Sequence, residues 1–414
     1  MDLLDGVIQP YAWGDPQAIA DLQGRTPSGE PEAELWLGAH PVAPGRLAST
    51  GRSLADATAA EPAAVLGAAV ADRFGRFPYL LKILAAAEPL SIQVHPSLIQ
   101  AKAGFAREEE HGPALGQPDR TYRDDNHKPE LICALTPFEA KCGFRDPELT
   151  TALVGALAAR RGGTQLSSFA AALSVGGTAG ERLSATLAWL FGLSADDAAT
   201  LVDELLDAAA VALAEIADGA GADVGAHRDE LESLAELHRF HPGDVGIPVS
   251  LLLNHVTLAP GQAMFLPAGN MHAYLRGVGV ELMANSDNVI RGGLTVKHID
   301  VDELLAVVDT NPMTAPVQTA VDGVHRFDTP VPEFALERVT GTEIEAVPTG
   351  PEIVLVTAGE ARLRPADGAD REAELLVGRG AAAIVYAADG PYRLTAPAGT
   401  VAWRATVGDL SLSA

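Results

Sequence analysis

The sequence is organised around two β-prone segments that each end in a histidine, Pro89-Leu-Ser-Ile-Gln-Val-His95 and Phe265-Leu-Pro-Ala-Gly-Asn-Met-His272. Residues two apart on an extended strand point to the same face, so Gln93 and His95 can converge on one point. His272 directly follows a turn, and Glu130 begins another β-prone stretch that can lie beside these segments. Alternating apolar runs with frequent turn residues around them predict a sandwich or a barrel.

The amino-acid composition and pattern of the chain change twice, which predicts a mainly β fold with an α-helical insertion. Residues 1–147 are rich in Gly, Pro and short β-prone runs, whereas residues 148–244 are dominated by Ala and Leu. Apolar residues recur with helical periodicity over 196–216, where Ser194 suits an N-cap and Gly219 a stop. We expect a discontinuous domain over 1–147 and 245–312, a helical domain over 148–244, and a further β domain over 313–414.

A repeat of the same texture near the C-terminus predicts a second copy of the β module. The segment 261–272 can be laid over 380–391, since each reads as a turn glycine, an apolar strand, a turn and the start of a next strand. The second copy has Pro391 where the first has His272. We therefore expect one metal ion per chain and a C-terminal copy without metal; the alternative is a chance similarity between two β-meanders.

Composition narrows the classes of partner. The 414 residues include 55 acidic and 29 basic residues, a formal net charge of −26. This field repels polyanions, which argues against nucleic acid or an anionic membrane surface as the main partner. No apolar run approaches the ~20 residues of a membrane span, and the acidic Met1-Asp-Leu-Leu-Asp5 lacks a signal-peptide pattern. We expect a monomeric cytoplasmic protein in which Cys133 and Cys142 are buried thiols.

Two imidazoles, one carboxylate and one amide oxygen form a donor set that suits Zn²⁺. The residues that can supply it are Gln93, His95, Glu130 and His272. The alternative is that the two histidines are hydrogen-bonded core residues without a metal. An anionic substrate would also need a local positive field, because the chain as a whole is acidic.

Lysine is rare, with five Lys against 24 Arg, and four of the five lie in the β segments. These four are Lys82, Lys128, Lys141 and Lys297, whereas Lys102 is the expected bystander. A further feature is the stretch from Glu281 to Arg291, which ends before two glycines that permit close approach of a ligand. An ordinary surface ion pair is the alternative for this Glu–Arg pair.

Together these segments resemble the type I phosphomannose isomerase family. The matching stretches occur in the family's order and are 9–14, 33–41, 78–84, 90–96, 126–130, 265–274 and 285–295. The resemblance implies a zinc cupin (jelly-roll) catalytic domain, interrupted by a helical domain and followed by a degenerate, metal-free cupin-like domain. It also implies a sugar-phosphate substrate, with mannose 6-phosphate and fructose 6-phosphate interconverted through an enediol(ate).

The resemblance assigns a role to each candidate residue. It implies that Gln93, His95, Glu130 and His272 bind zinc, that Arg291, Glu281 and Lys128 are catalytic, and that Ser91, Lys82, Trp13 and Glu34 bind substrate. Whether Glu281 or Lys128 moves the proton between C1 and C2 is left open by the sequence. Two other functions are also left open, a cupin oxygenase with a redox metal and a non-catalytic sugar-phosphate binder.

Overall fold

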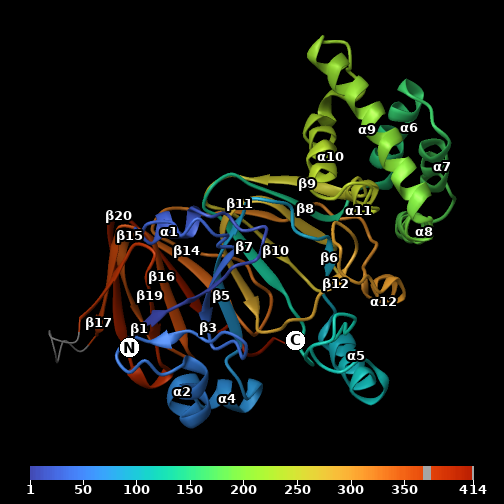
Figure 1. The fold of residues 1–414 in the computed structure, drawn as a ribbon. Coiled ribbons are helices and arrows are strands. Elements are labelled where there is room, and N and C mark those ends of the chain that lie inside the picture. The colour runs from blue at the N-terminus through green and yellow to red at the C-terminus, as the bar shows by residue number, and fades with distance from the viewer. Residues whose placement is uncertain (367–373, 413–414) are drawn as a thin grey trace.

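The computed structural model describes residues 1–366 and 374–412, which form two β sheets with one group of helices beyond an end of the sheets and further helices along their edges (Figure 1). The strands of the first sheet are β2 (Val7–Gln9), β3 (Glu34–Gly38), β5 (Tyr79–Ala86), β6 (Gln93–Val94), β7 (Glu130–Ala134), β8 (Phe138–Phe144), β9 (Leu253–Leu258), β10 (Gln262–Leu266), β11 (His272–Ala284), β12 (Ile290–Arg291) and β13 (Val317–Thr319). Seven of them follow the order β13-β10-β7-β11-β5-β3-β2, and β6, β8, β9 and β12 connect to this path through β11.

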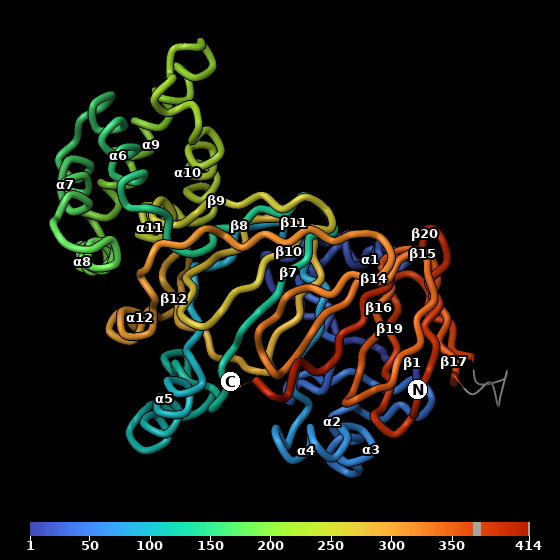
Figure 2. The backbone as a smooth tube through the Cα atoms, turned by 180° about the vertical axis from the view of Figure 1, so that it is seen from behind, coloured from blue at the N-terminus to red at the C-terminus, as the bar shows by residue number. Residues whose placement is uncertain are grey.

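The second sheet contains most of the C-terminal strands. Its members are β1 (Asp2–Asp5), β4 (Arg46–Leu47), β14 (Val324–Arg326), β15 (Ala335–Ala346), β16 (Glu352–Ala358), β17 (Glu360–Pro365), β18 (Leu375–Gly378), β19 (Ala382–Val385) and β20 (Tyr392–Thr406). The order is β14-β15-β20-β16-β19-β1-β4, and β17 and β18 join at β20. Figure 2 shows the two sheets side by side from behind.

Short strands cross between the two sheets, which the sequence did not indicate. The N-terminal β1 pairs with β19, with Leu3 opposite Ala383. Conversely, β13 pairs with β10 in the first sheet, with Gln318 opposite Ala263. The expected domain boundaries stay a prediction, but the first and last β regions exchange these strands, so neither sheet is built from one continuous part of the chain.

The long strand β11 joins the two layers of the first sheet. Its first half pairs with β6 and β8, and its second half pairs with β5 and β7. Residues 272–284 form one strand instead of two, because the chain bends in the middle and does not end there. A register irregularity after Tyr274 and the positive φ of Gly277 (121°) make the bend. A Cβ at Gly277 would lie 2.7 Å from the carbonyl oxygen of Pro137, so only glycine fits.

The faces of the two sheets that meet share one apolar core. Alternate residues of β5, such as Leu81 and Ile83, pack with Leu355 and Trp403 from the second sheet. Since side chains on a strand alternate between faces, Lys82 points to the opposite side, into the interior of the first sheet's layers. The same alternation turns residues of β11 and β3 toward that interior, which places polar residues there.

The helices form the insertion expected between the strands of the first sheet, along with shorter connections. They are α1 (Ala18–Leu22), α2 (Leu54–Ala60), α3 (Pro62–Leu66), α4 (Ala68–Phe74), α5 (Leu98–His111), α6 (Pro147–Arg160), α7 (Thr164–Leu173), α8 (Ala179–Phe191), α9 (Ala195–Ala217), η1 (Gly225–His227), α10 (Arg228–Phe240), α11 (Gly246–Ser250), α12 (Val301–Val307) and η3 (Ala387–Asp389). The predicted helix over 196–216 is α9. Ser194 caps it by accepting the N–H of Asp197 at 3.1 Å, and Gly219 follows its end with φ 77°. No helix in the described part of the chain has the length and apolar character of a membrane span.

Figure 1 shows α6 to α10 standing beyond one end of the first sheet, next to β8 and β9. Lys141, one of the four lysines singled out in the sequence, lies on β8 opposite His255 of β9. It is fully buried, and its Nζ has no hydrogen-bond partner among the described residues. Burial lowers the pKa of Lys141 to about 8, and the opposing charge of Glu230 on α10 does not restore it. Lys141 therefore stands on the side of the sheet that faces the helices.

We expect Lys141→Met to raise the free energy of unfolding at pH 7 by about 1–3 kcal/mol, because it removes a buried unpaired charge. Between the folded pKa of about 8 and the ordinary value of 10.5, the unfolded chain holds the proton more tightly. The native chain should therefore gain stability as pH rises through this window, and the variant should not. Urea unfolding at pH 7 and pH 10 measures the difference, with exposed Lys102→Met on α5 as the matched control. A variant less stable than the native chain at pH 7 would contradict this account.

Candidate active site

The first sheet brings the predicted metal ligands together inside its two layers. Ile92 and Val94 pack into the core beneath the helices, so the alternate residues Gln93 and His95 face the other way. In the pairing of β6 with β11, Gln93 lies directly opposite His272. Residues directly opposite on paired strands share a face, so the amide and the two imidazoles line one side of the same interior.

Glu130, the first residue of β7, stands between the two imidazoles. Its Oε1 lies 3.5 Å from His95 Nε2, and its Oε2 lies 3.3 Å from His272 Nε2. All three side chains are about 1% exposed. Neither Nε2 atom has a hydrogen-bond partner in the described part of the chain, although both are buried. Two buried nitrogens without partners, both beside a carboxylate, form a donor set that fits a metal ion.

The opposite ring nitrogens are held by backbone carbonyls. His95 Nδ1 lies 2.7 Å from the carbonyl oxygen of Asn288, and His272 Nδ1 lies 3.0 Å from that of Asn270. A ring that donates from Nδ1 to a carbonyl presents its Nε2 lone pair outward, which is the form that binds a metal. Burial, with a further contribution from Lys128, lowers the pKa of His95 to about 4. His95 is therefore neutral at pH 7, as a ligand must be.

Two lysines and two further carboxylates surround this donor set. Lys128 Nζ lies 2.8 Å from Glu130 Oε1. Lys82 Nζ lies 2.9 Å from Glu281 Oε2 and 3.3 Å from Glu34 Oε1. All five side chains are buried, so their charges act on one another with little screening by water.

The pKa values of this group follow from its charge balance. Burial alone lowers the pKa of Lys82, but the negative charges of Glu281 and Glu34 raise it above its ordinary value. Burial raises the pKa of Glu281, with Lys82 opposing this and Glu130 reinforcing it. In Glu130, by contrast, Lys128 and His95 outweigh burial and hold the pKa well below its usual range. Three carboxylates against two ammonium groups leave the interior one negative charge in excess, which a divalent cation offsets.

Arg291 lies in the same row of side chains. It pairs with Gln93 in the register of β12 and β6, so Arg291, Gln93 and His272 are neighbours across three strands. Burial and the nearby Arg123 guanidinium lower the pKa of Arg291. Burial, Arg291 and Arg123 likewise lower the pKa of Lys297. Within the described residues none of these three cations forms an ion pair, so they create a local positive field on an acidic protein.

The remaining predicted residues lie at the edge of this group. Glu34 accepts the indole N–H of Trp36 at 2.6 Å in addition to its contact with Lys82. Trp13 stacks on Tyr11, with ring centroids 5.7 Å apart. Ser91 lies two residues before Gln93, just outside β6. Of the four lysines singled out in the sequence, Lys141 alone is clearly outside the site, beneath the helices.

Two residues that lie near the site, Arg123 and Tyr11, were not predicted from the sequence. Arg123 lies in a loop whose sequence matches no recognisable motif, and only its closeness to Arg291 reveals it. Tyr11 is near Glu34 and Lys82, whose charges act on its phenol group, and burial is the largest cause of its raised pKa. Tyr11 lies two residues before Trp13, in the stretch 9–14 that resembles the family. The family motif therefore indicated this segment, although not Tyr11 itself.

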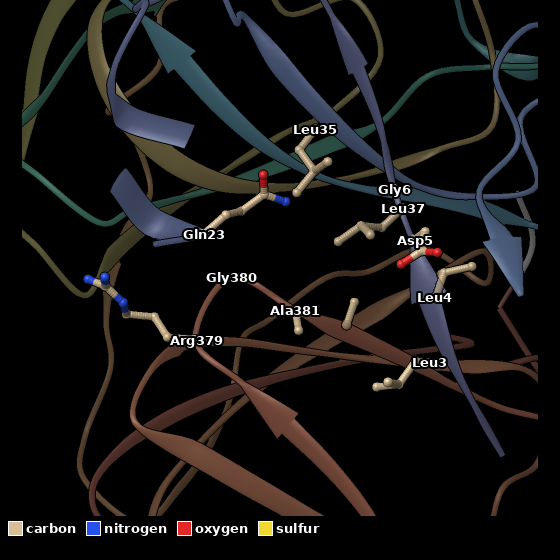
Figure 3. Close-up of a pocket in the computed structure, with 11 residues that line it drawn as sticks. Leu3, Leu4, Asp5, Gly6, Gln23, Leu35, Leu37, Arg379, Gly380 and Ala381 are labelled. Atoms are coloured by element: carbon tan, nitrogen blue, oxygen red, sulfur yellow. The ribbon is translucent and has the colours of Figure 1, made fainter. Parts of the chain in front are cut away.

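A separate cavity of about 280 Å³ opens between β1, β3 and the turn before β19. Figure 3 shows Leu35 and Leu37 above it, Leu3 and Leu4 to one side, and Arg379 at the opposite end. Its lining includes no histidine and none of the predicted site residues. This hollow lies between β3 of the first sheet and the β1 and β19 strands of the second, outside the polar interior of the first sheet.

Comparison with known proteins identifies the family to which the chain is similar. A family model for the catalytic domain of type I phosphomannose isomerase matches residues 1–147. The mannose-6-phosphate isomerase of Salmonella typhimurium is 37% identical over 405 residues, which cover 94% of this chain and 96% of that protein. The enzyme of Rattus norvegicus is 34% identical and covers 81% of each chain.

A solved structure of mannose 6-phosphate isomerase in its zinc-bound form matches this chain with a TM-score of 0.84 and 35% identity. The match covers 98% of this chain and 99% of that one. The agreement confirms the expected cupin architecture with its helical insertion. Likeness in both sequence and fold extends over nearly the whole length, so the chain belongs to the mannose-6-phosphate isomerase family of type I.

Proposed function

We propose that this protein is a zinc-dependent aldose–ketose isomerase that interconverts mannose 6-phosphate and fructose 6-phosphate. The observation that carries the proposal is the row formed by His272, Gln93 and Arg291, which sets a donor group for a metal beside a fixed cation. Isomerisation of a sugar at C1 and C2 needs both a base and stabilisation of the negative charge that develops on oxygen. The relatives' activity, given by their names, is the same reaction.

The metal proposal rests on the chemistry of the donors. Gln93, His95, Glu130 and His272 would hold one Zn²⁺ through an amide oxygen, two imidazole nitrogens and a carboxylate. The unpartnered Nε2 atoms and the excess negative charge of the interior both favour a divalent cation. When bound, zinc supplies a Lewis acid that orients the sugar and polarises its oxygens. The C-terminal module, with Pro391 in place of His272, is proposed to bind none.

The substrate phosphate needs a cation that is free to meet it. The resemblance implied that Lys82 binds substrate, but two carboxylates already share its ammonium group. Arg123 and Lys297 carry exposed charges beside Arg291 and form no ion pair with the described residues. We propose that these two hold the phosphate, with Ser91 on the adjoining segment as a hydroxyl donor. This local field resolves the conflict between an anionic substrate and a chain of net charge −26.

The chemical step then falls to the buried polar group. Glu281 is proposed to take the proton from C2 and return it at C1, since burial raises the pKa of its carboxyl and a carboxylate can act as a general base. Lys82, held between Glu281 and Glu34, fixes the direction of the Glu281 carboxylate. Arg291 stabilises the enediolate oxygens, because its guanidinium stays charged and the residue lies beside Gln93 in the pairing of β12 with β6. Lys128 is the alternative base.

The decisive experiment is a coupled assay of purified protein with mannose 6-phosphate, before and after chelation. We expect turnover that is lost on chelation and restored by Zn²⁺, with one metal per chain by elemental analysis. His95→Ala and His272→Ala should lose the metal. Turnover that consumes oxygen would instead identify an oxygenase, and binding without turnover would identify a sugar-phosphate binder.

Arg291→Ala should lower kcat by roughly 10²–10³, because the proposed contact forms only as charge develops on the enediolate. Lys297→Ala should mainly raise KM, because a phosphate contact is made equally in the ground state and the transition state. Zinc content should stay unchanged in both variants. Steady-state kinetics with both variants checks the separation. An Arg291→Ala enzyme with raised KM and native kcat would assign Arg291 to phosphate binding.

The two candidate bases are separated by isotope exchange. Glu281→Gln should abolish exchange of the substrate C2 hydrogen with solvent, because an amide cannot accept the proton, while sugar phosphate still binds. Lys128→Met should slow exchange less, since Lys128 is proposed to balance the charge of Glu130. Exchange that survives in Glu281→Gln and disappears in Lys128→Met would show that Lys128 is the base.

A monomer in the cytoplasm is proposed as the working form. Every residue of the proposed site comes from one chain, so no second copy is needed to complete it. Light scattering of the purified protein tests the oligomeric state, and a fluorescent fusion tests the compartment.

A further inference from the structure

The helical insertion reaches the loop that follows Arg291 through one carboxylate, that of Asp244. This residue lies in the turn between α10 and α11. The backbone N–H of Leu294 donates to its Oδ1 at 2.8 Å, and the N–H of Thr295 donates to its Oδ2 at 3.2 Å. The N–H of Gly246, in the same turn, also donates to Oδ1 at 2.6 Å. One side chain thus connects two segments that are 50 residues apart in the sequence.

The two backbones touch at a pair of glycines, which lets the carboxylate come so close. A Cβ at Gly246 would lie 2.5 Å from the backbone nitrogen of Leu294. A Cβ at Gly293 would lie 2.5 Å from the Cα of Gly246, and Gly293 also has a positive φ of 122°. No other residue fits at either position without moving the backbone. The contact is therefore built into the path of both segments.

The loop is held in a conformation that it would not prefer alone. Leu294 has φ 52°, and it is the one non-glycine residue with positive φ among residues 1–366 and 374–412. A leucine in this left-handed region is strained and persists only where its surroundings fix it. Its side chain is buried in the core cluster that includes Ile92 and Leu304, while its N–H is held by Asp244. Burial and the carboxylate together keep the loop in place.

The same loop is also aligned with the segment that carries the proposed metal ligand Gln93. The N–H of Gly292 donates to the carbonyl of Ile92 at 2.8 Å, and the N–H of Ile92 donates to the carbonyl of Gly293 at 3.0 Å. Arg291 stands at the start of this loop and Lys297 at its end. Any shift of residues 292–295 therefore moves both cations relative to Gln93.

We infer that Asp244 is a positioning residue, through which the helical insertion holds the loop 292–297 so that Arg291 and Lys297 meet the substrate. Asp244 itself touches no reacting atom in this account. The inference rests on the proposed function for its catalytic consequence, but the loop contact itself is independent of that function. It gives the helical insertion a direct part in the active site.

The test compares Asp244→Ala and Asp244→Asn with Asp146→Ala. The control removes another carboxylate of the helical region, which caps α6 through the N–H of Glu148 at 2.9 Å. Hydrogen exchange followed by mass spectrometry should show faster exchange over 292–297 in Asp244→Ala and native exchange there in the control. Unchanged exchange in Asp244→Ala would overturn the proposed contact, whatever the activity of the enzyme.

Kinetics of the zinc-loaded enzyme then test the consequence. Asp244→Ala should lower kcat at least about tenfold and raise KM, because small misplacement of a catalytic group is costly. Asp244→Asn keeps an oxygen acceptor for Leu294 but turns an NH₂ donor toward the N–H of Thr295, so it should recover part of the activity, whereas Asp146→Ala should remain near the native values. Loss of kcat in Asp244→Ala without recovery in Asp244→Asn would overturn the positioning role. Native protein without isomerase activity would refute the proposed function and leave the exchange result to stand alone.

Discussion

The site depends on the burial of the Glu130 carboxylate between two imidazoles. A buried charge is costly unless it is paired, and here Lys128 contacts one oxygen while both His Nε2 atoms face the carboxylate without other partners. The nearby pair Lys82–Glu281 and the second acceptor Glu34 extend this group. The interior is thus a set of charges that is nearly balanced without a metal and completed by a divalent one.

The alternation of side chains along strands lets this polar interior exist next to a large apolar core. On β5, Leu81 and Ile83 enter the core between the two sheets, and Lys82 between them enters the site. A shift of one residue in pairing would exchange the two faces and bury the charges among leucines. The second sheet therefore contributes to the site indirectly, because it covers the apolar face and fixes the register of the strands whose other face carries the charges.

The helical insertion contacts the first sheet at the end away from the second sheet. Through Asp244 it contacts the loop after Arg291, and through α10 it covers the face of β8 that carries Lys141. The cations Arg291, Arg123 and Lys297 meet at this end of the first sheet and give an acidic protein a place where an anion is attracted. The strands hold the proposed donor set and Arg291, while Arg123 and Lys297 come from loops, of which the second is held by Asp244 through Leu294 and Thr295.

Much of this could be read from the sequence alone. The periodicity over 196–216 with Ser194 and Gly219 located a helix, because local patterns encode local structure. The short motifs pointed to Gln93, His95, Glu130 and His272 as a ligand set, and the structure brings the last three of these within reach of one another. Tertiary structure decided which charges remain free. Lys82 and Lys141 look alike in sequence, yet one is held by two carboxylates and the other is buried without a partner. Arg123, the exchange of β1 into the second sheet and the bend of β11 at Gly277 also depend on contacts between distant segments, which no local pattern records, since pairing and burial are properties of the assembled chain.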